Sequence, residues 1–324
     1  MSFYVLKLKG RKPKYLALDG TSWEYGTKKI HLLTLSVVIN GVSIPIWWVE
    51  LDKKGTSNFQ ERKALMEEAL RIYDLRGMIL LADREYIGEE WFKYLKDNHL
   101  EFVIRLKKKI YKDYIDNQRQ GYDKHYKHQK WRYIGMEREA VKRKYSNCGV
   151  AKQVTILGVN YTFVIFKNPK EGAEEPLVYF LSTLKKKQKI VKAYPIRWSI
   201  ETCFKHLKSN GFNLEAMNFK KSEKIKMMMG IVVFLYALCL GEGWLQCQKT
   251  KKSDWKKYAD GTVTLAVSVF RKGRSYLTGK LGTLKSFIKY LRRLIRKGVN
   301  PYWVRMKQIL KSSQFAYNQV VNSV

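Results

Sequence analysis

The N-terminal third of the chain alternates between short apolar runs and segments with helical spacing. Apolar runs bounded by turn residues predict strands over 15–19, 30–39, 43–50, 78–82 and 101–106. Apolar residues at helical spacing predict helices over 58–74 and 88–97. Asn40-Gly41 lies between the second and third runs and predicts a tight hairpin turn. Three strands followed by helix, strand, helix and strand predict an α/β fold with a mixed sheet flanked by helices.

The pattern changes after Leu106. Residues 107–179 open as a basic, aromatic and hydrophilic stretch, and further strands are predicted over 154–157, 161–166 and 177–181, the first two joined by Gly158-Val159-Asn160. A largely apolar stretch over 222–247 predicts a helix that closes the core. Its longest uninterrupted apolar run, Ile231–Leu240, has ten residues, about half the length of a membrane-spanning helix. We therefore expect a buried core helix and no membrane.

The net charge of the chain indicates what kind of molecule it binds. The chain has 324 residues, with 63 Lys and Arg against 28 Asp and Glu, a formal net charge of +35. Such an excess destabilises a compact chain unless a polyanion is nearby, and it points to nucleic acid. The N-terminus lacks the apolar stretch of a signal peptide, and the four cysteines form no Cys-x-x-Cys pair. We therefore expect a cytoplasmic protein with reduced thiols.

One segment combines cations and a carboxylate at helical spacing. Tyr194, Arg197, Glu201 and Lys208 lie at offsets of 0, 3, 7 and 14. At about 100° per residue the last three fall within about 40° of one another, so one helix would present a carboxylate flanked by two cations. This arrangement suits a metal-bound phosphodiester, with the carboxylate holding the ion and the cations holding phosphate oxygens. The alternative is a solvated amphipathic face.

Other polar and aromatic residues near this segment are assigned to packing. Trp198, Ile200 and Cys203 fall outside the charged face of the predicted helix, and we expect them in the core. We expect Arg197 itself to lie in a site open to solvent. His125 and His128 with Cys148 match the spacing of no standard zinc site.

Two further acids follow predicted buried strands. Asp19 ends the apolar run 15–18 and precedes Gly20, and Asp83 ends the run 78–82. An acid at the end of a buried strand is costly unless it has a partner, and a divalent cation supplies one. Either Asp alone would be interpreted as a helix cap or turn residue. Together with Glu201 they form a coherent set of three carboxylates, a hard oxygen site.

These residues resemble the DDE transposases of bacterial insertion sequences. The most similar group is insertion-sequence family four, whose signature Tyr-x2-Arg-x3-Glu-x6-Lys is reproduced here without a gap, and Asp83-Arg84-Glu85 also resembles that family. The resemblance covers roughly residues 15–250 and is weak between 107 and 178. It implies a ribonuclease-H-like mixed sheet flanked by helices, with a β-rich insertion between the second Asp and the Glu. In that fold the first and fourth strands are adjacent, so Asp19 and Asp83 would meet.

The resemblance also implies a chemistry. Asp19, Asp83 and Glu201 would hold two Mg²⁺ ions, for which Mn²⁺ can substitute, and drive phosphoryl transfer at DNA ends. Arg197 and Lys208 would position the DNA strand, while Tyr194 would pack or bond to phosphate. The freed 3′-hydroxyl would then be joined to target DNA by cut-and-paste, with or without a hairpin intermediate. Double-stranded DNA, a homodimer on that DNA and a place at the bacterial nucleoid are the expected partners and location.

Two regions are candidates for further DNA contacts. In the insertion, Trp131 lies between Lys130 and Arg132, as stacking on a flipped base favours, and its alternative role is packing a small β-sheet core. Residues 251–324 carry 17 Lys and Arg against two Asp. Their apolar stripe comprises Leu284, Phe287, Ile288, Leu291, Leu294 and Ile295. The cations outside that stripe are Lys285, Lys289, Arg292, Arg293 and Arg296. We expect a helix ending near Gly298 that packs by its stripe and contacts phosphate, the alternatives being a dimerisation or membrane-surface helix.

The predicted organisation has four parts. They are a first part of the catalytic core over 1–106, the β-rich insertion over 107–179, a second part of the core over 180–250, and a basic helical C-terminal region over 251–324. Members of the resembled family usually carry a sizeable DNA-binding region before the first Asp, and only 18 residues precede Asp19 here. We therefore expect end recognition in the insertion and the C-terminal region, or a compact or decayed relative.

Two other functions use the same features. A related nuclease would share every catalytic residue but join nothing. A DNA-binding protein derived from a transposase would have lost catalysis altogether. The intact acids Asp19, Asp83 and Glu201 favour an enzyme over the second alternative, because drift is expected to remove an idle acid.

Overall fold

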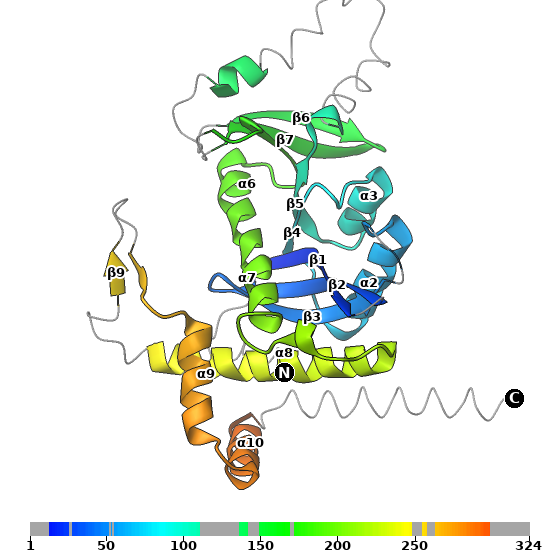
Figure 1. The fold of residues 1–324 in the computed structure, drawn as a ribbon. Helices are drawn as coiled ribbons and strands as arrows, with labels where there is room; N and C mark the ends of the chain where they lie inside the picture. The colour runs from blue at the N-terminus through cyan, green and yellow to red at the C-terminus, as the bar shows by residue number, and fades with distance from the viewer. Residues whose placement is uncertain are drawn as a thin grey trace, which may run out of the picture. The chain divides into compact units, whose positions relative to one another are not determined.

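An eight-stranded mixed sheet organises the larger of two compact units (Figure 1). The computed structural model describes residues 13–25, 28–51, 53, 55–110, 136–141, 149–168, 172–247, 255–257 and 263–298. The strand order is β3-β2-β1-β4-β5-β8-β7-β6. The strands span Tyr15–Tyr25 (β1), Lys28–Ile39 (β2), Val42–Glu50 (β3), Ile79–Ala82 (β4), Glu101–Leu106 (β5), Val150–Ile156 (β6), Val159–Lys167 (β7) and Leu177–Ser182 (β8).

The first and fourth strands are neighbours, as predicted. β1 pairs with β4 in parallel from Tyr15 to Leu18, where Leu18 lies opposite Ala82, and β4 pairs in parallel with β5. Asp19 and Asp83 follow that last pair, so the two acids lie level with each other. β1 continues to Tyr25, paired only with β2, because β4 ends at Ala82. Asp19 is therefore in the middle of its strand, and the prediction that β1 ends there is wrong.

The predicted hairpin is confirmed by its backbone. Asn40 and Gly41 have φ angles of 50° and 77° and join β2 to β3. Both values lie in the left-handed region, which a two-residue hairpin turn requires and which Gly adopts without strain. The second hairpin turns at Leu157 and Gly158, slightly before the position predicted from Gly158-Val159-Asn160. Local turn chemistry thus fixes the register of both antiparallel pairs.

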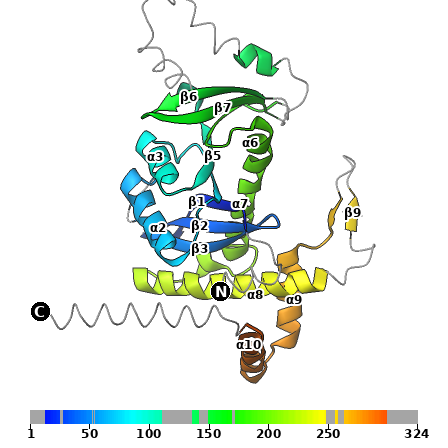
Figure 2. The ribbon, with the colours of Figure 1, turned by 180° about the vertical axis from the view of Figure 1, so that it is seen from behind.

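Helices cover both faces of the sheet (Figures 1 and 2). α2 and α3 lie on one face, while α6 and α7 lie on the other. Their bounds are Phe59–Ile72 (α2), Glu89–Asp97 (α3), Lys187–Ala193 (α6) and Trp198–Leu207 (α7), with 3₁₀ turns at Tyr194–Arg197 (η3) and Leu214–Ala216 (η4). α2 begins with a capping box, in which Asn58 and Glu61 satisfy each other's backbone N–H groups. These layers match the predicted mixed α/β architecture.

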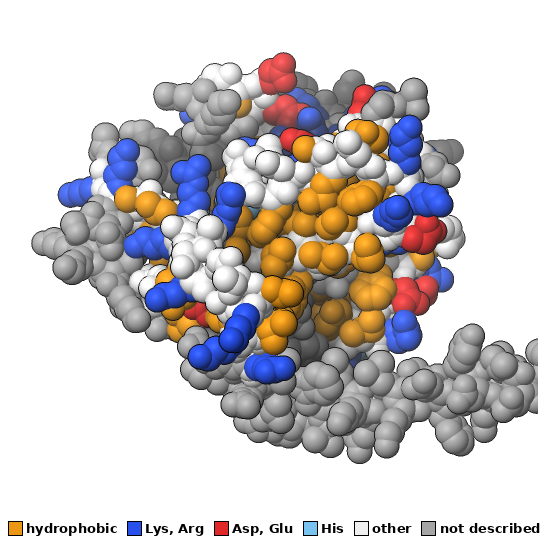
Figure 3. Space-filling view, turned by 60° about the horizontal axis from the view of Figure 1, so that its bottom comes forward, with side chains coloured by type: hydrophobic (Ala, Val, Ile, Leu, Met, Phe, Trp, Pro, Cys, Tyr) orange, Lys and Arg blue, Asp and Glu red, His pale blue; other side chains and the backbone are white. Residues whose placement is uncertain are grey.

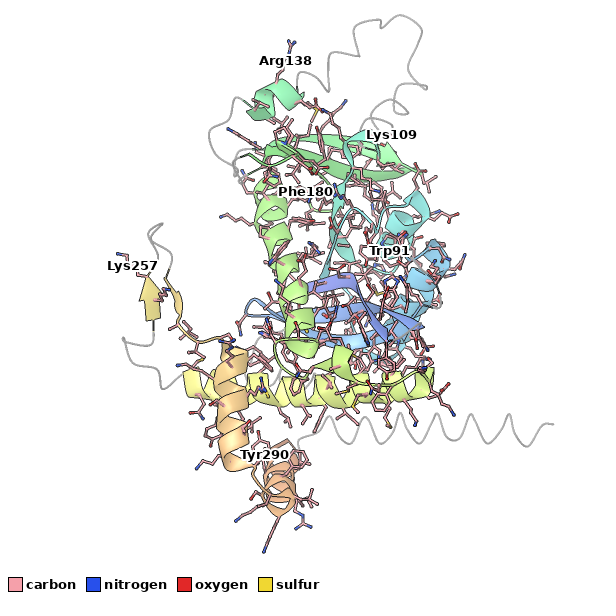
Figure 4. The ribbon with its side chains drawn as sticks, in the orientation of Figure 1. Trp91, Lys109, Arg138, Phe180, Lys257 and Tyr290 are labelled. Atoms are coloured by element: carbon pink, nitrogen blue, oxygen red, sulfur yellow. The ribbon has the colours of Figure 1, made fainter. Side chains whose placement is uncertain are left out.

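Apolar packing places α7 directly over β1. Ile200 and Phe204 contact Ala17 and Val38 in a buried cluster. Further along the same face, Phe180 of β8 is fully buried in the cluster that also contains residues of α6 (Figure 4). Removing such side chains from water is the main force that fixes a helix against a sheet, worth roughly 1.5–3 kcal/mol per large side chain. The helix that carries Glu201 is therefore held rigidly over the strand that carries Asp19.

The strands of the predicted insertion continue the same sheet. β8 pairs antiparallel with β5 between Val103 and Leu106, and β7 and β6 follow it outward. The described residues from 13 to 235 form one compact unit. The division at 107 and 180 into core and insertion stays a prediction from sequence.

A second compact unit begins inside the long helix α8. α8 spans Ser222–Cys247, and the unit starts at Tyr236. The remaining described elements are β9 (Trp255–Lys257), β10 (Val263–Leu265), α9 (Val269–Lys280) and α10 (Leu284–Gly298). Within this unit the Tyr290 hydroxyl donates to the buried Glu242 carboxylate at 2.7 Å. That bond connects α10 to α8.

Two described residues of the apolar stripe of α10 are exposed. Leu284 is 74% and Ile288 40% exposed, whereas Phe287 and Leu291 are half-buried. The prediction that the whole stripe packs is therefore wrong for its first turns.

Two glycines let α8 and α9 approach at backbone distance. A Cβ added at Gly273 would overlap the carbonyl of Cys239, and one at Gly243 would overlap the carbonyl of Val269. We expect Gly273→Ala to destabilise this unit by about 1–3 kcal/mol or more, because the helices must separate. Gly279, on the same helix, has no atom within 4 Å of an added Cβ. Gly279→Ala should be neutral or stabilising by up to about 1 kcal/mol. Thermal melts of the two variants test whether α8 and α9 are in backbone contact at Gly273. Equal melting temperatures of the two variants would contradict this contact.

α8 has the length and composition of a membrane span. Among the described helices it alone combines at least 18 residues with high hydropathy, and 61% of its most apolar window is buried. Its buried residues include Val232 and the run from Tyr236 to Trp244. Buried core helices pass the same test, so the finding is weak evidence for a membrane. The count of ten consecutive apolar residues underestimated how apolar this helix is.

Candidate active site

Three carboxylates from three separate elements face one another. Asp19 lies on β1, Asp83 follows β4, and Glu201 lies in the first turn of α7. Their side chains are 18%, 28% and 29% exposed. The parallel pairing of β1 with β4 brings the two Asp residues together, and the packing of α7 over β1 adds Glu201. The tertiary structure thus unites acids that lie 64 and 118 positions apart in the sequence.

A single guanidinium lies among the three carboxylates. Arg197 Nη1 donates to Asp19 Oδ2 at 3.1 Å, and Nη2 donates to Glu201 Oε1 at 2.7 Å. Asp83 Oδ2 lies 4.0 Å from Nη2. The Arg197 side chain is only 7% exposed. Burial lowers its pKa, but Tyr194 and the carboxylates outweigh burial and raise it, so the guanidinium is charged.

Two tyrosines, the buried Tyr86 and the half-buried Tyr194, hold the Asp side chains. Tyr194 donates its hydroxyl proton to Asp83 Oδ1 at 3.1 Å, and burial, followed by the charge of Asp83, raises its pKa to about 12. Tyr86 points its hydroxyl at Asp19 Oδ1 over 3.5 Å, a long contact, and is 3% exposed. Burial, followed by the charge of Asp19, raises its pKa well above the ordinary value. Both hydroxyls therefore remain protonated and act as donors to carboxylates.

Asp19 has a perturbed acidity. Burial raises its pKa to about 6, although Arg197 and the backbone N–H of Gly20 both act to lower it. Glu201 and Asp83 raise it further because like charges oppose ionisation. Without a bound cation, Asp19 therefore begins to take up a proton as pH falls toward about 6. A perturbed carboxylate among several others is typical of functional sites.

The donor set fits a hard divalent cation. Within the described residues the site offers carboxylate and phenol oxygens from Asp19, Asp83, Glu201 and Tyr194. No three His, Cys, Asp or Glu side chains in the described segments are arranged so that they could hold an ion together as they stand. The reason is geometric, because the Arg197 guanidinium occupies the centre. An ion held by all three carboxylates would have to replace contacts that Arg197 now makes.

Lys208 does not join the carboxylates. It is the residue after the last turn of α7, where the backbone leaves the helix. Its Nζ donates to the Ser22 carbonyl at 2.8 Å and lies 3.6 Å from Glu215 Oε2. Lys208 is the C-cap of α7, and its backbone N–H still bonds to the Phe204 carbonyl at 2.9 Å, so its predicted place on the face of Glu201 and its predicted contact with DNA stay predictions. Its side chain ties the end of α7 to the extended part of β1.

Arg197 was predicted to be open to solvent and Trp198 to be buried, and the structure shows the opposite for both. Trp198 is 60% exposed, whereas Arg197 is 5% exposed. Ile200 and Cys203 are fully buried, as predicted. Arg197 is buried because the carboxylates supply the charge it needs, which leaves Trp198 to face solvent. Trp198 and Tyr194 flank the guanidinium, with ring centroids 5.9 and 5.7 Å from its carbon.

The structure does not describe several of the residues that were predicted to contact DNA. Trp131, Lys130 and Arg132 fall outside the described residues, as do His125, His128 and Cys148. Lys289 and Arg292 are exposed on α10. Arg293 and Arg296 lie on the same helix, but their side chains are outside the described part. These assignments remain predictions.

The structure adds residues that the sequence did not assign. Tyr86 is three positions after Asp83, at the spacing that turns an aromatic residue back toward its own strand end. Glu175, from the loop before β8, pairs with both Arg84 and Arg105. The acidic loop in a strongly basic chain was the signal by which the sequence could have identified Glu175 as a residue of interest. No local pattern identified its partners.

The site belongs to a defined class of proteins, the DDE transposases. A family model described as "Transposase DDE domain" matches residues 10–238. This match covers more than half of the chain and spans Asp19, Asp83 and Glu201. The chain therefore belongs to the transposase DDE domain family. No match was found among curated proteins.

Three solved structures resemble parts of the chain. A piggyBac transposase synaptic complex with hairpin DNA is 12% identical, with a TM-score of 0.43, and covers 94% of this chain but 59% of its own. The HTLV-2 integrase catalytic core domain in complex with magnesium is 17% identical, with a TM-score of 0.23, over 35% of this chain and 74% of its own. The NurA nuclease from Sulfolobus solfataricus is 14% identical, with a TM-score of 0.28, over 72% of this chain and 92% of its own. This chain spans about three fifths of the piggyBac chain. We draw no functional conclusion from these three.

Proposed function

We propose that this protein is a transposase of the insertion-sequence family four type. It cuts and joins DNA ends by metal-dependent phosphoryl transfer on a ribonuclease-H-like core, with the β-rich insertion at 107–179. The observation that carries the proposal is the convergence of Asp19, Asp83 and Glu201 on Arg197. The family match over residues 10–238 supports the same chemistry.

The carboxylates would hold the catalytic cations. Asp19, Asp83 and Glu201 offer the oxygen ligands that Mg²⁺ prefers, with Mn²⁺ as a substitute. Two such ions supply charge stabilisation at both the attacking and the leaving oxygen of a phosphodiester. Tyr86 and Tyr194 orient the Asp carboxylates through their hydroxyl protons. Their raised pKa keeps them neutral donors.

Arg197 has a second role in this proposal. Its guanidinium supplies one positive charge among the three carboxylates and offsets part of their negative charge when no cation is present. When cations offset that charge, its donors become available for phosphate oxygens, which the planar fork matches in geometry. Trp198 presents an exposed aromatic surface beside this group. The residue therefore serves stability and substrate binding in turn.

The DNA partner follows from the charge of the chain. A net charge of +35 favours double-stranded DNA, and we propose a homodimer on DNA at the bacterial nucleoid. Figure 3 shows one face of the molecule, where hydrophobic side chains gather with Lys and Arg side chains around them. α8 contributes the exposed Met227 and Ile231 to the apolar surface of the protein.

An end-joining assay separates this function from its rivals. The full chain would be incubated with Mg²⁺, labelled duplexes that carry the terminal repeats flanking its gene, and a target plasmid. We expect cut ends and their joined products, because a transposase uses the freed 3′-hydroxyl as the next nucleophile. Cutting without joining would identify a nuclease. Binding without cutting in either Mg²⁺ or Mn²⁺ would identify a DNA-binding protein derived from a transposase.

A further inference from the structure

Two arginines beside Asp83 form ion pairs with the same glutamate from another loop. Arg84 Nη1 lies 2.8 Å from Glu175 Oε1, and Arg105 Nη2 forms a short contact with Glu175 Oε2. Arg84 follows Asp83 directly, and its backbone N–H donates to Asp83 Oδ1 at 2.7 Å. Arg105 is on β5, the parallel neighbour of β4, and is close enough to Tyr194 to act on its pKa. The two guanidinium groups thus lie beside the candidate active site.

The glutamate comes from an acidic loop in a strongly basic chain. Glu174 and Glu175 precede β8, and Asn168 closes their loop by donating its side-chain N–H to the Glu175 carbonyl at 3.0 Å. The chain holds 28 acids against 63 cations, so few acids are available anywhere on its surface. One of them, Glu175, pairs with two arginines next to the acids that would cut DNA and offsets half of their charge. Neither Arg84 nor Arg105 needs this partner to be stable, because both are partly exposed.

The contact of the two arginines with Glu175 resembles a phosphate-binding site in its geometry and charge. One carboxylate offers two oxygens and one negative charge, and each oxygen is taken by a different guanidinium. A phosphodiester offers the same charge on two non-bridging oxygens, and Arg binds it with the same donors. The Glu175 side chain is 44% exposed, so solvent and ligands have access to the pair.

We propose that Arg84 and Arg105 form a binding site for one DNA backbone phosphate beside Asp83, and that Glu175 occupies this site until DNA displaces it. The inference rests on the proposed function, since it assumes that DNA approaches Asp83. Glu175 then acts as an internal competitor that weakens DNA binding at this point. It would reduce capture of arbitrary DNA by a chain that is basic throughout.

Binding of a short fluorescein-labelled duplex, measured by anisotropy without divalent cations, tests the proposal. Glu175→Gln removes the competing charge and should tighten binding about fivefold at low salt, the scale of one or two exposed ion pairs. Glu174→Gln is the matched control, because Glu174 is an exposed acid with the same charge in the same loop. It should change affinity less than about twofold. Glu175→Ala should reproduce the gain of Glu175→Gln.

A double replacement assigns the effect to the arginines. In an Arg84→Gln/Arg105→Gln background, binding should be weaker, and adding Glu175→Gln should change it no further. The proposal is overturned if Glu174→Gln tightens binding as much as Glu175→Gln, or if the gain persists without the arginines. Thermal melts confirm that each variant is folded. Because the measurement needs no catalysis, failure here is distinct from failure of the end-joining assay.

Discussion

Replacing Asp83 by Asn should abolish Mg²⁺-dependent DNA cleavage and leave DNA binding largely intact. The carboxylate is one of three that would hold the catalytic cations, and the amide is a neutral and weaker ligand. Losing about 4 kcal/mol of transition-state stabilisation corresponds to roughly 1,000-fold in rate. Asp19→Asn and Glu201→Gln should have effects of the same size. Single-turnover cleavage of a labelled duplex, with anisotropy for binding, measures both properties.

The control for this experiment lies two residues away. Glu85 is exposed and follows Arg84, so Glu85→Gln removes one acid near the site without touching the three carboxylates. It should retain cleavage within about threefold, as most surface substitutions do. Ca²⁺ should support binding with little cleavage, since its coordination is looser than that of Mg²⁺. Cleavage that persists in all three variants of the carboxylates would remove the basis of the proposed function.

Replacing Arg197 by Ala should lower the stability of the cation-free protein by about 3–5 kcal/mol. Removing one partner of a buried ion pair leaves the others uncompensated, and here three carboxylates would lose their common counter-charge. The loss corresponds to a fall of roughly 10 °C in melting temperature. It contradicts the expectation from sequence that Arg197 lies in an open site and matters little for folding. Thermal melts in EDTA measure it.

Mg²⁺ and a neighbouring residue provide the controls. Divalent cations should raise the melting temperature of Arg197→Ala more than that of the unchanged protein, because a cation replaces the missing guanidinium. Trp198→Ala should melt within about 1 kcal/mol of the unchanged protein, since its side chain is 60% exposed. An Arg197→Ala protein that melts normally in EDTA would show that the carboxylates do not depend on this residue. A large loss in Trp198→Ala would show that α7 is turned the other way.

Local patterns predicted most of the sheet and its order. Apolar runs marked β1 to β5 within a few residues at most boundaries, and Asn40-Gly41 marked a hairpin, because strand and turn formation depend on residues close in sequence. The adjacency of β1 and β4 was implied by the resemblance to the ribonuclease-H-like fold, and it is confirmed. That adjacency was enough to predict that Asp19 and Asp83 meet. The family signature around Glu201 supplied the third acid.

Ideal helical geometry failed where the chain departs from an ideal helix. The segment 194–208 was treated as one helix at a constant rotation per residue. The structure has a 3₁₀ turn at Tyr194–Arg197 and ends α7 at Leu207, and the Lys208 side chain bonds to the Ser22 carbonyl of β1. A 3₁₀ turn and a helix end depend on packing and capping that spacing does not contain. The offset pattern was therefore right for Arg197 and Glu201, four residues apart, which form a hydrogen bond, while the DNA contact of Lys208 stays a prediction.

By itself the sequence determined most elements of the N-terminal part, the candidate acids and the resemblance to the DDE transposases, since each depends on composition and on neighbours along the chain. Only the tertiary structure decided that Arg197 is buried while Trp198 faces solvent. The reason is that burial of a charge depends on its partners, and one partner of Arg197, Asp19, is 178 residues away. The same holds for Glu175, whose contact with Arg84 spans 91 residues. Hydrophobic periodicity records which residues avoid water, but only the folded chain shows which charges neutralise each other.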